Sequence, residues 1–122
     1  MHKRTILVVE DDVDIRENLA EFLLSEGYAV QTAADGRKAL DLLRTASDLP
    51  QVILLDLRMP RMDGFKFREE QEKDARLAAI PVLLMTADAQ IESEKYKIGA
   101  VGYVKKPIDI EALAKTLRAF YK

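Results

Sequence analysis

The stretch Thr5-Ile6-Leu7-Val8-Val9-Glu10-Asp11-Asp12 joins a short apolar run to an abrupt acidic end. The run is continuous and rich in β-branched side chains, a pattern typical of a strand that is buried on both faces of a sheet. Four further short strands are predicted at residues 28–32, 52–55, 82–85 and 102–105. The sequence therefore predicts a sheet assembled from five segments that lie far apart along the chain.

Segments with helical periodicity separate these strands. One helix face of the first segment carries Ile15, Leu19, Phe22 and Leu23. Asp12 or Asp14 can cap its start, and Gly27 can supply the left-handed residue just past its end. Further helices are predicted to begin at Gly36, which follows Asp35, and to cover residues 65–76, 89–98 and 110–120. On the last of these, one face carries Ile110, Leu113, Ala114, Leu117 and Phe120.

Strands that alternate with helices through short connections predict an α/β fold. The expected architecture is a (βα)5 doubly wound, five-stranded parallel sheet with helices on both sides. A chain of 122 residues has the size of one domain, and we expect residues 1–122 to form that single domain.

Composition excludes several classes of chemistry. With no cysteine, the chain has neither disulfides nor thiolate metal sites, and its single histidine, His2, cannot form a catalytic triad or a histidine metal cluster. A net charge of -2 gives no reason to expect direct nucleic-acid binding. No apolar segment is long enough for a signal peptide or a membrane helix, so we expect a cytoplasmic protein without membrane insertion.

Polar side chains follow four of the five predicted strands. These residues are Glu10, Asp11, Asp56, Thr86 and Lys106, the last followed by Pro107. In an open parallel sheet, ligands bind beyond the carboxyl ends of the strands. If the strand order is 2-1-3-4-5, the carboxylates after the first and third strands converge. Two carboxylates about 4 Å apart repel by roughly 4 kcal/mol at an effective dielectric constant of 20, so they protonate, pair with cations or hold a divalent metal. Oxygen ligands without histidine or cysteine suit Mg²⁺.

Each of these residues also has a purely structural interpretation. Asp12 and Asp14 are best explained as helix caps, Thr86 could be a strand-end hydroxyl, and Lys106 a solvated amine. Asp56 resists such an explanation, because it follows four apolar residues and precedes Leu57. The combination of complementary polar residues at four strand ends therefore favours a functional site.

In these stretches the sequence resembles the receiver domains of two-component response regulators. The matching segments are Val8-Val9-Glu10-Asp11-Asp12, Leu54-Leu55-Asp56-Leu57-Arg58-Met59-Pro60, Met62-Asp63-Gly64, Met85-Thr86-Ala87 and Lys106-Pro107. They occur in the family's order and spacing along essentially the whole chain. The resemblance implies the flavodoxin-like strand order 2-1-3-4-5.

The resemblance also implies a role for each site residue. Asp56 would accept a phosphoryl group from the phosphohistidine of a sensor histidine kinase or a histidine phosphotransfer protein. Mg²⁺, or Mn²⁺ in its place, would be held by Asp11, Asp56, Glu10 (through water) and the backbone carbonyl of Arg58. Lys106 and Thr86 would contact phosphoryl oxygens, with Pro107 after a cis peptide bond and Gly64 in a structural role.

The expected output of this family is conformational. Thr86 would move toward the phosphoryl group, and Tyr103, at the aromatic switch position, would rotate inward. The predicted helix 89–98 has few apolar anchors, which suits an element with two packing states. The downstream protein target would bind the 89–121 face, and the chain would be a monomer or a phosphorylation-dependent dimer.

One hypothesis concerns two charges beyond the family's main motifs. Arg58 lies two residues after Asp56, and Asp88 lies two residues after Thr86. They are predicted to pair across the mouth of the site and to slow hydrolysis of phosphorylated Asp56. The alternative is two independent surface charges, worth about 0–1 kcal/mol even in contact.

Two other functions remain open from the sequence. An inactive pseudo-receiver would serve only as an interaction module, although it typically lacks the acceptor, an acid or the lysine. A phosphatase with an aspartate nucleophile would be a true enzyme, but it needs a second aspartate where this chain has Arg58. We therefore expect a regulator rather than an enzyme, as a single-domain protein or as a fragment of a longer one.

Overall fold

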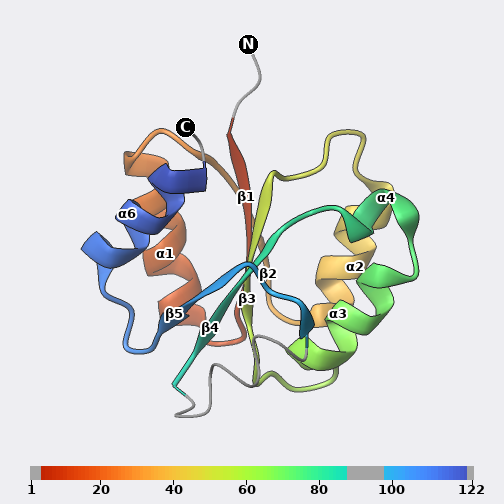
Figure 1. The fold of residues 1–122 in the computed structure, drawn as a ribbon. Helices are drawn as coiled ribbons and strands as arrows, with labels where there is room; N and C mark the ends of the chain where they lie inside the picture. The colour runs from red at the N-terminus through yellow and green to blue at the C-terminus, as the bar shows by residue number, and fades with distance from the viewer. Residues whose placement is uncertain (1–3, 88–97, 121–122) are drawn as a thin grey trace.

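The computed structural model describes residues 4–87 and 98–120, and its strands form one sheet (Figure 1). The strands are β1 (Thr5–Val9), β2 (Ala29–Ala33), β3 (Val52–Asp56), β4 (Val82–Thr86) and β5 (Gly102–Lys105). All neighbouring pairs are parallel, and the order is β2-β1-β3-β4-β5. The predicted α/β fold and its flavodoxin-like strand order are confirmed.

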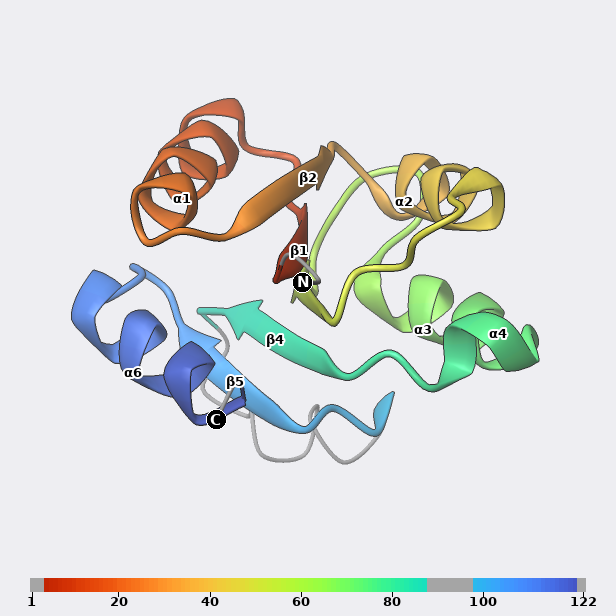
Figure 2. The same cartoon turned by 90° about the horizontal axis from the view of Figure 1, so that it is seen from above.

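Helices cover both faces of this sheet (Figure 2). They are α1 (Val13–Ser25), α2 (Gly36–Thr45), α3 (Gly64–Glu72), α4 (Ala75–Ala78) and α6 (Ile110–Phe120). Helices α1 and α6 lie on one side of the sheet, and α2, α3 and α4 lie on the other. Of the predicted helix 89–98, only Ile98 falls within the described residues. No helix in the described ranges is long and apolar enough to cross a membrane.

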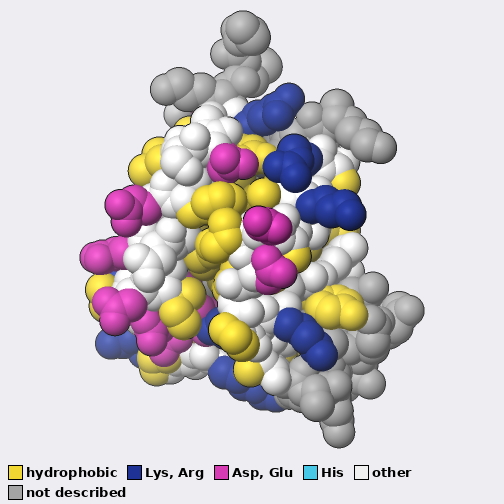
Figure 3. Space-filling view, turned by 90° about the vertical axis from the view of Figure 1, so that its left-hand side faces the viewer, with side chains coloured by type: hydrophobic (Ala, Val, Ile, Leu, Met, Phe, Trp, Pro, Cys, Tyr) yellow, Lys and Arg dark blue, Asp and Glu magenta, His cyan; other side chains and the backbone are white. Residues whose placement is uncertain are grey.

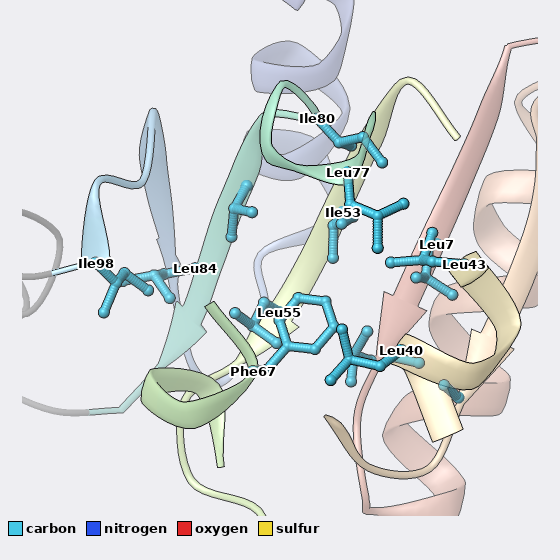
Figure 4. Close-up of a cluster of buried hydrophobic side chains, with 14 of the residues drawn as sticks. Leu7, Leu40, Leu43, Ile53, Leu55, Phe67, Leu77, Ile80, Leu84 and Ile98 are labelled. Atoms are coloured by element: carbon cyan, nitrogen blue, oxygen red, sulfur yellow. The ribbon is translucent and has the colours of Figure 1, made fainter. Parts of the chain in front are cut away.

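Each central strand supplies buried side chains to both layers, as expected for a strand covered on both faces. Ile53 and Leu55 of β3 belong to a cluster with side chains of α2 and α3, including Phe67 (Figure 4). Val52 and Leu54, which alternate with them, pack with side chains of α1 and α6. The short apolar runs thus form the middle layer of the fold.

The predicted start and end of the first helix agree with the structure. The Asp12 carboxylate accepts a hydrogen bond from the Ile15 amide at 3.0 Å, which identifies Asp12 rather than Asp14 as the cap. Gly27 has φ +93°, the left-handed conformation expected just past a helix end.

The single helix predicted over residues 65–76 is wrong, because the structure contains α3 and α4 with a break between them. Asp74 has extended backbone, and its carboxylate accepts a hydrogen bond from the Arg76 amide at 2.9 Å, so it ends one helix and caps the next. Buried Gln71 donates from its side-chain amide to the carbonyls of Leu77 and Ile80. These local hydrogen bonds replace those of a continuous helix.

The predicted apolar face of the last helix is only partly correct. Leu113, Ala114 and Leu117 are buried, as the periodicity predicts. Ile110, in contrast, is 39% exposed at the first position of α6. The Ile110 side chain lines an open groove with Pro107 and Ile108 instead of packing in the core, which leaves it partly in contact with solvent.

Candidate functional site

Three carboxylates converge at the carboxyl edge of the sheet. Glu10 directly follows β1, Asp56 ends β3, and these two strands are hydrogen-bonded neighbours. Oxygen atoms of Glu10, Asp11 and Asp56 all lie within 4.8 Å of one another. Glu10 and Asp56 are buried, whereas Asp11 is exposed. The cluster is therefore closed on its inner side and reachable from solvent at Asp11.

Among the described residues, Lys106 supplies the cation that pairs with the carboxylates of this cluster. Its ammonium Nζ lies 2.6 Å from Glu10 Oε1 and 3.2 Å from Asp56 Oδ1. The Lys106 amide donates to the Thr86 carbonyl at 3.0 Å, which continues the β4–β5 pairing and aims the side chain at the cluster. The Lys106–Pro107 peptide bond is cis, as the family resemblance implies.

The environment of Asp56 changes its acidity. The pKa of its carboxyl is raised to about 7: burial is the largest cause, the hydrogen bond and negative charge of Glu10 act in the same direction, and Lys106 partly opposes them. Burial lowers the pKa of Lys106, but its contacts with Glu10 and Asp56 outweigh that effect and raise it. Near neutral pH, one ammonium therefore does not fully balance the three carboxylates.

The donors of this cluster fit a hard divalent cation. Carboxylate oxygens without nitrogen or sulfur ligands are what Mg²⁺ and Mn²⁺ prefer. Glu10, Asp11 and Asp56 offer one oxygen each within a span small enough for a common ion. Such an ion would supply the positive charge that Lys106 alone does not provide.

The remaining predicted site residues lie on the neighbouring strands. Thr86 is the last residue of β4, is 3% exposed, and lies one position beyond Met85, the β4 partner of Asp56. Tyr103 lies in β5 opposite Leu84 and is half-buried against the cluster on the α2–α3 side. Thr86 and Tyr103 therefore lie on β4 and β5, the two strands that follow β3 toward one edge of the sheet.

The predicted pairing of Arg58 with Asp88 stays a prediction, because Asp88 lies outside the described residues. Arg58 is exposed, and its guanidinium carbon lies 5.7 Å from the centre of the Phe65 ring. This cation–π contact was not expected from the sequence. It places the arginine side chain toward the start of α3.

Gly64 brings the loop after Asp56 close to β3. Its amide donates to the Leu57 carbonyl at 2.9 Å, and a Cβ here would lie 3.0 Å from both the Asp56 carbonyl oxygen and Leu57 Cα. These neighbours are backbone atoms that cannot rotate away. The close approach therefore requires glycine.

We expect Gly64→Ala to lower the free energy of unfolding by about 1–3 kcal/mol, because the added methyl group displaces backbone at the site. Denaturant unfolding of the metal-free protein measures this loss. The control is Lys66→Ala, at an exposed position of the same helix, which should change stability by less than about 0.5 kcal/mol. Equal stabilities of the two variants would contradict the prediction.

Arg16 is a site residue that the sequence pattern did not indicate. Its Nη1 donates to the Glu10 carbonyl at 2.8 Å and to the Asp11 carbonyl at 3.4 Å. The side chain reaches back from α1 and holds the backbone that carries two of the three acids. Contacts of side chains with backbone carbonyls have no characteristic residue pairing, so no sequence signal could identify this one.

Comparison with known proteins places this geometry in a family. The family model described as response regulator receiver domain matches residues 6–118. Response regulator MprA of Mycolicibacterium vanbaalenii is 38% identical over 119 residues, which cover 96% of this chain and 50% of that protein. The DNA-binding dual master transcriptional regulator RpaA of Synechocystis is 37% identical, over 96% of this chain and 48% of that protein. This chain thus spans about half the length of these relatives.

The fold is also similar to that of a solved structure along nearly its full length. Chemotaxis response regulator CheY4 of Vibrio cholerae superimposes with a TM-score of 0.88 at 35% sequence identity. The match covers 98% of this chain and 99% of that protein. A receiver fold therefore accounts for the described structure as a whole.

Proposed function

The chain belongs to the response regulator receiver domain family, and from this membership we propose that it is a phosphoacceptor signalling module in which Asp56 receives the phosphoryl group. Residues 1–122 would constitute one receiver domain. The observation that carries the proposal is the position of the Asp56 carboxylate, which lies beside Lys106 and two further acids at the carboxyl edge of the sheet.

The proposed reaction moves one phosphoryl group between two side chains. A carboxylate oxygen of Asp56 attacks the phosphorus of a phosphohistidine, the P–N bond breaks, and its electron pair stays on the imidazole nitrogen. Mg²⁺ or Mn²⁺, bound by Glu10, Asp11, Asp56 and the Arg58 carbonyl, would offset the charge of the reacting anions. Lys106 would bind a phosphoryl oxygen as a point charge, and the Thr86 hydroxyl would donate to another.

The ionised form of Asp56 is the nucleophile, so its acidity controls the proposed reaction. When the pH is above the Asp56 pKa of about 7, the carboxylate carries no proton. When the pH is below that value, the proton must leave before attack. A bound divalent ion favours the same ionised form. Metal binding and nucleophile activation are therefore coupled at one carboxyl group.

A small phosphodonor tests this function without knowledge of the cognate kinase. We expect the purified chain, given Mg²⁺ and acetyl phosphate, to gain the mass of one phosphoryl group at Asp56. An inactive pseudo-receiver would gain none. A phosphatase would release inorganic phosphate continuously and at a high rate without accumulating the adduct.

We expect Mg²⁺ to stabilise the protein more strongly above the pKa of Asp56 than below it. The ion and a proton compete for this carboxyl group, so protonation weakens binding. At a free Mg²⁺ concentration 100 times the dissociation constant, the gain is about 2.7 kcal/mol. Denaturant unfolding with Mg²⁺ or with EDTA, one series on each side of the pKa, measures it. A gain that is equal at both pH values would contradict the prediction.

An apolar groove beside Lys106 is the proposed docking site of the phosphodonor. The groove has a volume of about 350 Å³ and is lined by Ile15, Asn18, Leu19, Lys106, Pro107, Ile108 and Ile110. It lies on the side of the molecule formed by α1 and α6, where apolar side chains gather (Figure 3). A helix that presents a phosphohistidine at the acidic cluster would rest its apolar side chains here. The donor would be a sensor histidine kinase or a histidine phosphotransfer protein in the cytoplasm.

We expect Ile110→Glu to slow phosphoryl transfer from a phosphohistidine protein while leaving acetyl phosphate labelling unchanged. The substitution places a charge in the groove but does not touch the acidic cluster. Initial labelling rates with the two donors measure the effect. Leu24→Glu, at another exposed apolar position on the same side of the sheet, is the control. A proportional loss with both donors would contradict a docking role.

The proposed output is a conformational change that begins at Thr86 and Tyr103. Thr86 and Tyr103 would transmit the change at Asp56 to the 89–121 face, where a downstream protein or a second phosphorylated copy would bind. Residues 88–97 lie outside the described part of the chain, so this proposal rests on Tyr103, Thr86 and the family. Direct binding of nucleic acid by this domain is not proposed.

A further inference from the structure

We propose that an ion pair between Arg61 and Asp35 is a clamp that holds the loop following Asp56 and thereby sets the affinity of the acidic cluster for a divalent cation. This inference rests on the proposed function. The clamp joins the β3–α3 loop, residues 57–63, to the β2–α2 loop. Neither residue contacts the reacting atoms, so both are positioning residues.

The Asp35 carboxylate is fully engaged although it lies outside the acidic cluster. It is 1% exposed, and its Oδ1 accepts a hydrogen bond from the Lys38 amide at 2.9 Å as the cap of α2. Its Oδ2 accepts from Arg61 Nη1 at 3.2 Å. A buried carboxylate is costly without charge-assisted partners, so the arginine contact is a defined part of the structure.

The Arg61 backbone has an unusual conformation for a residue with a side chain. Its φ is +64°, the one positive φ at a non-glycine position within the described residues. Such a conformation costs about 1 kcal/mol or more and persists only when the surroundings hold it in place. The arginine side chain is 69% exposed, so burial does not hold it. The Met62 amide donates to the Pro60 carbonyl at 2.7 Å across Arg61 and closes a tight turn there, and the ion pair with Asp35 ties this turn to the start of α2.

The two loops also touch through their backbones. The Gly36 amide donates to the Met62 carbonyl at 3.3 Å, and a Cβ on Gly36 would lie 2.9 Å from both that oxygen and Met62 Cγ. Leu57, the first residue of the loop, is held by the hydrogen bond that its carbonyl accepts from the Gly64 amide at 2.9 Å. The segment between Leu57 and Met62 is therefore held at its two ends.

This segment begins at the residue after Asp56 and includes Arg58, whose carbonyl is a proposed metal ligand. A shift of the loop would move that carbonyl and the end of β3 together. Residues that orient metal ligands typically contribute about 10-fold or more to affinity. The clamp would act by keeping the oxygen donors in place before the ion arrives.

Titration calorimetry of the whole chain with Mg²⁺, above the pKa of Asp56, tests the inference. Asp35→Asn keeps an oxygen to cap α2 but removes the charge that Arg61 binds. Arg61→Ala keeps the backbone position but removes the guanidinium. We expect each variant to raise the dissociation constant about 10-fold. The double variant should be no worse than either, because both remove the same contact.

Two further variants separate positioning from general stability. Arg61→Lys keeps a cation and should recover part of the affinity, and Arg37→Ala, at an exposed arginine next to Gly36, should bind like wild type. The clamp is overturned if the Asp35 and Arg61 variants bind Mg²⁺ within about two-fold of wild type, even where their thermal unfolding temperatures fall. Failure of the wild type itself to bind Mg²⁺ would instead overturn the proposed metal site, and this inference with it.

Discussion

Asp56→Asn is expected to abolish phosphorylation by acetyl phosphate and to raise the stability of the metal-free protein. The amide is no nucleophile, and the other two acids of the cluster lack the position of Asp56 at the end of β3 beside Lys106. The expected adduct is therefore absent rather than reduced. Intact-mass analysis after incubation with Mg²⁺ and the phosphodonor measures this directly.

The stability gain follows from the acidity of Asp56. Its pKa is raised from 3.8 in the unfolded chain to about 7 in the native state, so the native state binds more protons between these values. The Asp56 contribution is thus favourable at low pH and is lost as pH rises through about 7. Asparagine does not titrate, so the Asp56→Asn variant escapes this loss. Its stability relative to wild type therefore increases as the pH rises between the two pKa values and stays constant above them. We expect a gain of about 2–4 kcal/mol above both pKa values.

Denaturant unfolding in EDTA across this pH range measures the gain. Asp48→Asn, at an exposed aspartate, is the matched control and should change stability by less than about 0.5 kcal/mol at any pH. A gain that did not depend on pH would contradict the assignment of the raised pKa to Asp56. Phosphorylation of the Asp56 variant at the wild-type rate would identify another residue as the acceptor.

The second large effect is expected at Lys106. Lys106→Ala removes the cation that lies 2.6 Å from Glu10, a carboxylate with 0% exposure. Breaking a buried ion pair by removing one partner typically costs about 3–5 kcal/mol, because the remaining charge is left buried without compensation. We expect a loss near the lower value in the metal-free protein, together with much slower formation of the adduct.

Two matched variants test the reason for this loss. Lys105→Ala removes an exposed amine from the neighbouring position and should leave stability and labelling close to wild type. Adding Glu10→Gln to Lys106→Ala removes the uncompensated charge and should restore part of the stability, but not the labelling rate. If the double variant were less stable than Lys106→Ala alone, the buried charge would not be the cause. Urea unfolding and adduct formation by mass measure the two effects separately.

Much of the fold could be predicted from local sequence. β1 and β5 have the predicted bounds, β3 and β4 each extend one residue further, and β2 begins and ends one residue later. Short apolar runs and helical periodicity are local patterns, so they indicate elements without knowledge of their neighbours. The break at Asp74 was missed, because a helix end made by one capping side chain competes with a pattern that continues through it.

Sequence by itself determined which residue types follow each strand, and hence that Glu10, Asp11 and Asp56 could share one edge of the sheet. Only the tertiary structure decided that Lys106 lies between Glu10 and Asp56, because these contacts join residues that are 96 and 50 positions apart in the sequence. The same holds for the pKa of Asp56, which depends on burial and on the charges brought beside it. Arg61 and Asp35 are 26 residues apart with no pattern that links them, since their contact arises where two loops meet at the same edge. A local pattern can therefore place a residue on an element, whereas the energy of a charged site depends on distances that only folding sets.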